Sequence, residues 1–105
     1  MVSNRREQLE EFVRQNPTDA FARYGLAMEL MRSGEAEEAL AQFRLLQEKH
    51  PNYAAGFQQA GQLLMSLERN DEARVILQRG LEAAGASGDR HAASEIQGLL
   101  DELAG

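Results

Sequence analysis

The fold of this chain is decided by the stretch LAMELMRSGEAEEALAQF, which runs from Leu26 to Phe43. The same pattern returns 34 residues later, between Ala60 and Leu77, with small residues on small ones and large apolar residues on large apolar ones. The matching positions are Ala27 with Gly61, Leu30 with Leu64, Glu38 with Glu72, Ala39 with Ala73, and Phe43 with Leu77. Chance accounts for one or two such pairs but not for the whole set, so the chain contains an internal repeat.

The apolar residues within each repeat follow the spacing of an amphipathic helix, three or four residues apart on one face. In the first repeat the two runs are Leu26, Ala27, Leu30 and Ala39, Leu40, Phe43, Leu46. In the second repeat they are Phe57, Ala60, Gly61, Leu64 and Ala73, Ile76, Leu77, Gly80, Leu81. Each repeat is therefore predicted to be a pair of helices.

Turn and cap residues separate these helices. Pro17 and Pro51 match at the same offset, and each ends an incoming helix, with Thr18 and Asn52 as the expected N-caps of the next one. The segment Gly85-Ala86-Ser87-Gly88 is expected to break the chain before a last helix, which Ser87 or Asp89 caps. We expect six helices, near residues 4–15, 20–33, 36–49, 53–67, 71–84 and 89–103.

The segment from Ala20 to Pro51 resembles a tetratricopeptide repeat. The residues that carry the resemblance are the Leu26-Ala27 pair, the turn glycine Gly34, Ala39, the packing aromatic Phe43 and the closing proline Pro51. In the second copy they are Phe57, in the usual tryptophan place, with Gly61, Leu64 and Ala73. The resemblance implies an all-α, right-handed α-solenoid of antiparallel helix pairs. It also implies a single domain over 1–105, with two full repeats (about 20–53 and 54–87).

Within that domain we assign residues 1–17 and 88–105 to capping helices, and residues 18–51 and 52–87 to the two repeats. The first and last helices carry charged residues around one apolar stripe each, as the ends of a repeat array require, which indicates a complete domain. Gly25 and Gly98 lie inside helices, where each weakens its helix by roughly 1 kcal/mol relative to alanine.

The chain also departs from the family pattern at four positions. Arg23 stands where a large aromatic residue is usual, Glu68 replaces the second turn glycine, Leu46 replaces an alanine, and Gly85 replaces the second closing proline. The small residues at positions 27, 39, 61 and 73 have a mechanical role, because a larger side chain at a helix crossing pushes the two axes apart.

Composition and charge exclude several classes of function. Seventeen acidic residues against eleven basic ones give a net charge of -6, and the arginines form no basic run, so no nucleic acid partner is expected. The absence of cysteine excludes disulfides and thiolate metal sites. No apolar stretch is long enough to cross a membrane, and the charged N-terminus does not resemble a signal peptide. A cytoplasmic location is therefore expected.

The polar residues form no recognisable catalytic constellation. His50 and His91 lie in different repeats with no second histidine at ligand spacing, so no metal is expected. The cluster of Ser87, Asp89, His91 and Ser94 is explained better by helix capping than by a nucleophilic site. Acidic groups near helix starts fit solvated faces beside the helix dipole. We therefore expect neither enzymatic activity nor a cofactor.

The resemblance implies that the first helix of each repeat lines a concave groove. Residues there that are not needed within a repeat are free to bind a partner. In this chain they are Phe21, Tyr24, Met28, Met31 and Arg32 in the first repeat, and Gln58, Gln62 and Met65 in the second, beside Ala55. The alternative is that Phe21, Tyr24 and the methionines only pack against the first helix or the next repeat. For Phe21 and Met31 this alternative stays equally open, whereas exposure to the groove is expected for Tyr24, Met28, Gln58 and Gln62. A surface of aromatic and methionine side chains suits adaptable contact with an apolar helix or peptide.

These observations favour a protein-interaction module or scaffold that binds a peptide or amphipathic helix in its groove. The alternative is structural self-association through the same groove, as a homodimer without a foreign ligand. Family members that clamp a C-terminal carboxylate use lysine, arginine and asparagine in the groove, and Tyr24, Met28, Gln58 and Gln62 stand there in this chain. That mode of capture is not expected. A third hypothesis, an enzyme or enzyme subunit, rests on no feature of the sequence. If groove variants kept every partner, the interaction surface would lie elsewhere, for example on the convex side near Leu45.

Overall fold

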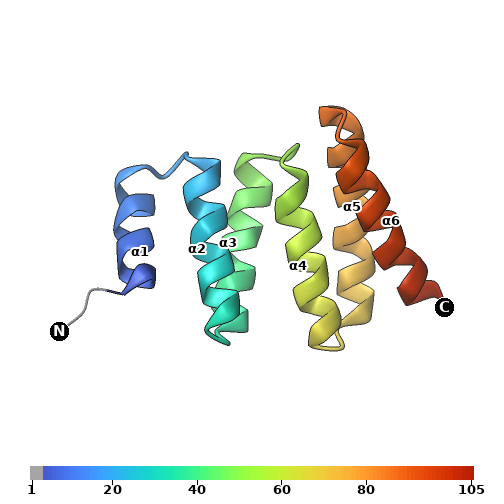
Figure 1. The fold of residues 1–105 in the computed structure, drawn as a ribbon, viewed down its shortest axis with the longest axis horizontal. Coiled ribbons are helices and arrows are strands. Elements are labelled where there is room, and N and C mark those ends of the chain that lie inside the picture. The colour runs from blue at the N-terminus through green and yellow to red at the C-terminus, as the bar shows by residue number, and fades with distance from the viewer. Residues whose placement is uncertain (1–3) are drawn as a thin grey trace. The chain divides into compact units, whose positions relative to one another are not determined.

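The computed structural model describes residues 4–105, and all regular secondary structure in this part of the chain is helical. Its helices are α1 (Arg5–Gln15), α2 (Ala20–Arg32), α3 (Ala36–Lys49), α4 (Ala54–Ser66), α5 (Asn70–Ser87) and α6 (Arg90–Ala104). Short turns join them, so consecutive helices run antiparallel within each part of the chain (Figure 1). The predicted all-α fold is confirmed. Residues up to Lys49 form one compact unit and His50–Gly105 form a second, called here the N-terminal and C-terminal units.

In the N-terminal unit, α2 packs against both α1 and α3. Ala27 of α2 and Ala39 of α3 are completely buried, as expected for small residues at a helix crossing. The ring of Phe43 is also completely buried, together with Leu46. The small alanines and the aromatic residue are thus buried in this unit, as the sequence predicted.

In the C-terminal unit, α5 packs against α4 and α6, and glycines bring the three helices close. A Cβ atom on Gly61 would lie 2.4 Å from Leu77 Cδ2, which no real contact allows. A Cβ atom on Gly80 would lie 2.9 Å from Phe57 Cβ and 3.1 Å from Ile96 Cδ1. Gly80 therefore gives α5 room to pack on both neighbours at once. Its matching position in the first repeat, 34 residues earlier, is the large residue Leu46.

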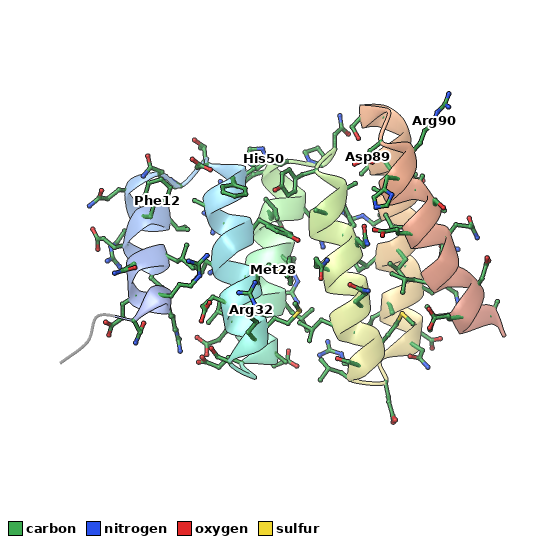
Figure 2. The ribbon with its side chains drawn as sticks, in the orientation of Figure 1. Phe12, Met28, Arg32, His50, Asp89 and Arg90 are labelled. Atoms are coloured by element: carbon green, nitrogen blue, oxygen red, sulfur yellow. The ribbon has the colours of Figure 1, made fainter. Side chains whose placement is uncertain are left out.

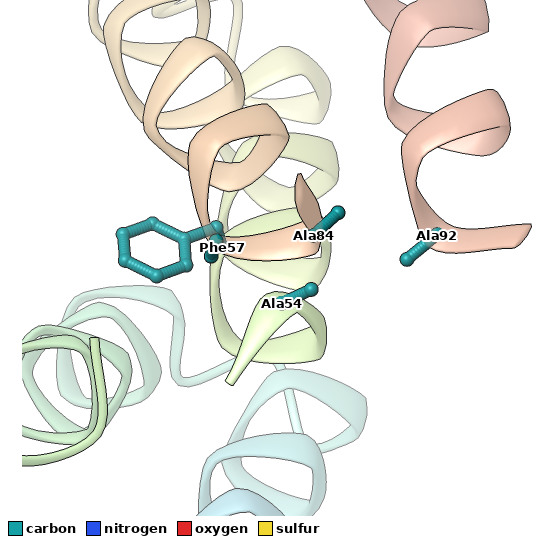
Figure 3. Close-up of a cluster of buried hydrophobic side chains, with 5 residues drawn as sticks. Ala54, Phe57, Ala84 and Ala92 are labelled. Atoms are coloured by element: carbon teal, nitrogen blue, oxygen red, sulfur yellow. The ribbon is translucent and has the colours of Figure 1, made fainter. Parts of the chain in front are cut away.

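An alanine-rich cluster closes one end of the C-terminal unit (Figure 3). It combines Ala54 and Phe57 of α4, Ala83 and Ala84 of α5, and Ala92 of α6, all of them buried. The small side chains let the backbones of the three helices approach one another closely. Close packing between the helices, rather than the burial of large side chains, therefore stabilises this end of the unit.

Three of the helices end in the same hydrogen-bonded turn. At Gly34, Glu68 and Gly88 the backbone has a positive φ of 79°, 60° and 72°. In each turn the next residue donates to the carbonyl five residues back, as in the bond from Arg69 N to Leu64 O of 2.9 Å. This pattern is the Schellman motif, which normally takes glycine. Glu68 thus keeps the family's turn without the glycine, at the cost of a left-handed conformation that L-residues disfavour.

The structure corrects three predicted helix ends. The N-cap of α2 is Asp19 rather than Thr18, because the Asp19 carboxylate accepts from Ala22 N at 2.9 Å. The N-cap of α4 is Tyr53 rather than Asn52, without a side-chain hydrogen bond. Helix α5 continues past its expected end at residue 84 to Ser87, and only Gly88 terminates it. Of the two expected caps of α6, Asp89 is the one observed.

The unusual Arg23 is a buried residue of α2, only 7% exposed. Its guanidinium donates from Nη1 to Gln42 Oε1 at 2.8 Å and from Nη2 to Pro17 O at 3.0 Å. Arg23 therefore joins α2 to α3 and to the turn before α2 by hydrogen bonds, in a place where an aromatic side chain would act by packing alone.

Candidate functional site

The structure distributes the predicted groove residues over two helices. Phe21, Tyr24, Met28, Met31 and Arg32 all lie on α2, and we call this set the α2 surface. Gln58, Gln62 and Met65 lie on α4. Spacings of three and four residues put the members of each set on one side of their helix. That the two sets face one continuous groove stays a prediction of the sequence.

The α2 surface is largely open to solvent at its two ends. Phe21 is 77% exposed, an unusual state for a phenylalanine, and Arg32 is exposed as well. Between them, Tyr24, Met28 and Met31 are half-buried. Met28 and Arg32 follow one another along α2 (Figure 2). The helix thus offers an aromatic ring, two thioethers and a cation along one stripe.

Tyr24 does not fit the expectation that these side chains take no part in packing. Its ring meets that of Phe43 edge to face, with 6.4 Å between the ring centroids. Burial raises the pKa of Tyr24 above its ordinary value, and the nearby charge of Arg32 opposes this only in part. Tyr24 therefore belongs partly to the core of its unit, and only its remaining face is open to a partner.

Charged groups border the α2 surface at the end of Arg32. The Arg32 guanidinium lies 3.4 Å from Glu29 Oε1, and Arg5 of α1 lies 3.3 Å from the same oxygen. Neither Arg5 nor Glu29 was among the residues predicted for the site. The three-residue spacing of Glu29 and Arg32 could have predicted their ion pair. The ion pair of Arg5 with Glu29 could not be predicted, because it depends on how α1 packs against α2.

On α4, two of the predicted residues, Gln58 and Gln62, lie beside α6. Gln62 is exposed, and Gln58 and Met65 are half-buried. Gln58 Nε2 donates to Glu95 Oε1 of α6 at 2.8 Å. Both glutamines line a depression of about 270 Å³ between the two helices, which we call the α4–α6 depression. Its other lining residues are Glu95, Gly98, Leu99 and Glu102, none of them predicted.

Another depression, of about 460 Å³, lies in the N-terminal unit and contains no predicted groove residue. Its apolar lining comes from Val13, Leu26, Leu30 and Ala41, and its polar lining from Glu10, Arg14, Glu38 and Gln42. Large apolar side chains are also exposed outside the α2 surface, at Phe12, Leu45, Leu67 and Val75. These residues lie on other helices or in turns, so they do not extend the α2 stripe.

The histidines and acidic groups form no metal-binding cluster of three or more ligands within residues 4–105. His91 Nε2 instead lies 3.2 Å from Glu95 Oε2, one helical turn away on α6. In the same part of the chain, no helix combines the length and apolar character needed to span a bilayer.

Comparison with known proteins adds independent evidence. The family model of the tetratricopeptide repeat matches residues 2–94. TPR repeat-containing protein PA0015 of Pseudomonas aeruginosa is 29% identical over 97 residues, which cover 92% of both chains. A tetratricopeptide repeat domain protein of Salinibacter ruber, known from a crystal structure, is 34% identical, with a TM-score of 0.76 over 81% of this chain and 94% of that one.

Two further solved structures share the fold. Protein BPP2914 of Bordetella parapertussis has a TM-score of 0.82 and 25% identity, covering 98% of this chain and 90% of that protein. The TPR2B domain of yeast Sti1, solved in a complex with pHsp70, has a TM-score of 0.87 at 19% identity, covering 94% of this chain and 79% of that one. At that identity the second likeness concerns the fold alone.

Proposed function

Since this chain belongs to the tetratricopeptide repeat family, whose repeats generally mediate protein–protein interaction, we propose that it is an interaction module that binds a partner polypeptide at the α2 surface. The partner presents an apolar peptide or the apolar face of an amphipathic helix. Proteins of this family are generally non-enzymatic scaffolds, which agrees with a binding role rather than a catalytic one.

The observation that carries the proposal is the exposure of Phe21. At 77% exposed, its ring contributes little to the core, and water meets most of its apolar area. The half-buried Met28 and Met31 continue the apolar stripe on the same side of α2. Large apolar groups gathered in this way mark an interaction surface, because burying them against a partner removes their contact with water.

The side-chain types indicate what kind of partner is bound. Methionine is unbranched and polarisable, so it adapts to a partner's shape, and phenylalanine supplies a rigid anchor. The ion pairs among Arg5, Glu29 and Arg32 provide a polar border at one end of the stripe. An apolar centre with a polar border matches an amphipathic helix, whose own faces are divided in the same way.

The complex of the yeast Sti1 domain with pHsp70 supports a binding role, since that domain shares the fold of this chain. The side chains differ in chemistry, however. Tyr24, Met28, Gln58 and Gln62 supply no positive charge, so we propose apolar contact rather than capture of a terminal carboxylate.

The test is the double substitution Phe21→Ala/Met28→Ala, compared with Leu45→Ala on α3 as a matched loss of an exposed apolar side chain. Retention of partners from the native extract is measured by quantitative mass spectrometry, and unfolding by urea titration. The double variant is expected to lose a partner that the parent and the α3 control both retain, because aromatic anchors commonly contribute about 2 kcal/mol to binding. Its free energy of unfolding should change by less than about 1 kcal/mol.

Two outcomes would overturn the proposal. A double variant that folds normally and keeps every partner places the interaction elsewhere, and loss of partners by Leu45→Ala points to α3. Sedimentation of the pure parent distinguishes a foreign partner from a second copy of the chain. A dimer that Phe21→Ala/Met28→Ala dissociates would make self-association the function of the α2 surface.

A further inference from the structure

We infer that the α4–α6 depression accepts a basic side chain, best an arginine, from a partner polypeptide. The inference rests on the proposed function and deepens it, because it names a charge that the partner carries. The depression belongs wholly to the C-terminal unit, so its geometry is defined by α4 and α6 alone.

Two helices contribute complementary halves of the depression. On α6, Glu95, Gly98, Leu99 and Glu102 are spaced by three, four and seven residues, which puts them on one face over two turns. On α4, Gln58 and Gln62 lie one turn apart and face them. A volume of about 270 Å³ is therefore bordered by two carboxylates and two amides, with an aliphatic side chain among them.

The charge of the depression has one sign. No basic residue lines it, and α4 has no charged side chain at all. From His50 to Gly105 the sequence has eight acidic and four basic residues, so the surrounding unit is negative too. The cations on α6 are Arg90, in its first turn, and His91, when protonated. Charge complementarity therefore selects a cationic partner group.

The two carboxylates differ in how they are held. Glu95 accepts from Gln58 through Oε1 and lies beside His91 through Oε2, so its orientation is set before a ligand arrives. Glu102 is exposed and makes no ion pair with any residue from 4 to 105. A bound cation would therefore contact the Glu95 carboxylate, whose orientation is already fixed, and the Glu102 carboxylate, which can move towards it. Because only one of the two side chains must be ordered on binding, the entropic cost of binding is lower.

Gly98 lines the depression without a side chain that would fill it. A Cβ atom at this position would meet nothing within 4 Å, so neither helix packing nor a backbone turn requires glycine there. Glycine in the middle of a helix is unfavourable relative to alanine. The space above Gly98 is what the residue provides, and half-buried Leu99 lines it with apolar surface for the stem of a long side chain.

Arginine matches this combination best. Its planar guanidinium presents several N–H donors that fit carboxylates, and amide oxygens accept from it as well. Its methylene groups can lie along Leu99 while the charged end reaches Glu95 and Glu102. A lysine has the same charge but concentrates it at one strongly hydrated point, so it should bind more weakly.

The experiment is an NMR titration of the full chain with N-acetyl-arginine amide, using N-acetyl-citrulline amide as the uncharged isostere. The reporters are the side-chain NH₂ signals of Gln58 and Gln62 and the backbone amide of Gly98. The arginine probe should shift these signals in a saturable manner, and the citrulline probe should not. Equal shifts from both probes, shifts confined to other residues, or no shift would each overturn the inference.

Variants locate the effect. Glu102→Gln should weaken the binding of the arginine probe by about two- to fivefold, which is the effect expected for the loss of a single exposed charge pair. Asp101→Asn removes the same charge from the neighbouring position, outside the depression, and should change binding by less. Gly98→Leu should abolish binding while Gly98→Ala largely preserves it. Equal effects of the two acidic variants would mean a diffuse field rather than a site.

The result is independent of the α2 surface. Phe21→Ala/Met28→Ala should leave the arginine titration unchanged even if it removes partner binding. Conversely, a failed arginine titration leaves the proposed role of α2 standing, because that role is tested by its own variants.

Discussion

Gly61→Ala adds one methyl group at the crossing of α4 and α5, and it tests the packing of the C-terminal unit directly. The new Cβ would lie 2.4 Å from Leu77 Cδ2 and 2.6 Å from Leu77 Cγ. Favourable contacts between carbon atoms lie at about 3.5–4.0 Å, so both distances fall short by roughly 1 Å. Leu77 is completely buried, and its Cγ as well as its Cδ2 lies too close to the new Cβ. Either the Leu77 side chain must change its rotamer within the core or the two helices must separate.

Two opposing effects determine the size of the change. Overpacking of this kind costs about 1–3 kcal/mol, and the short distance to Leu77 Cγ places Gly61→Ala near the upper end. Replacing glycine by alanine within a helix returns about 1 kcal/mol. We therefore expect a net loss of about 2 kcal/mol in the free energy of unfolding. For a domain of this size that lowers the melting temperature by roughly 10 °C.

The assay is urea unfolding followed by circular dichroism, and Gly98→Ala is the matched control. At Gly98 a Cβ meets nothing within 4 Å, so the same substitution should stabilise the chain by about 1 kcal/mol. The same substitution is thus expected to lower the free energy of unfolding at position 61 and to raise it at position 98. If Gly61→Ala also stabilised the protein, α4 and α5 could not approach as closely as described, and the role of glycine at this crossing would be wrong.

Three further outcomes follow from other parts of the structure. Glu68→Gly should stabilise the chain by about 1 kcal/mol in urea unfolding, since it relieves a left-handed residue, and a loss would contradict the turn geometry. Arg23→Ala should lower the free energy of unfolding by about 2 kcal/mol, because it removes buried hydrogen bonds. Arg44→Ala, at an exposed site, should leave it almost unchanged, and equal effects of the two variants would contradict the burial and hydrogen bonding of Arg23. In a Tyr53→Phe background, absorbance should show Tyr24 titrating above the ordinary pKa of tyrosine, which is about 10. Because burial favours the neutral phenol, the stability that Tyr24 contributes should be fully present below about pH 10 and should be lost as the pH rises through the pKa of Tyr24 in the folded protein. A Tyr24 pKa at or below about 10 would contradict the burial of its ring.

The sequence predicted the helix pairs because the determining residues act locally and recur at one offset. Ala27, Ala39 and Gly61 are small for reasons that any tight helix crossing imposes, and the structure confirms their positions. The end of α5 was missed because Gly85 and Gly88 both carry the same local signal. In the structure only Gly88 of the two has a positive φ, and Asp89 N donates to Ala84 O at 2.8 Å in the turn that ends the helix.

The candidate site could be predicted only at the level of which helix carries it. Helical spacing placed Phe21 and Met28 on one stripe, but the rotation of α2 against α3 decides that Tyr24 meets Phe43. The α4–α6 depression was missed because its shape depends on how α6 packs against α4. The one available signal was Gly98, a glycine within a helix that no packing contact requires.

The most direct test of the central claim is photo-crosslinking from the α2 surface. A photoreactive phenylalanine analogue is introduced at Met28, and separately at Val75 on α5, which is 56% exposed. After irradiation in the native extract, the position-28 protein should form an adduct of defined mass with another polypeptide, and the position-75 protein should not. Adducts from position 75 with none from position 28 would contradict the claim that α2 is the binding surface.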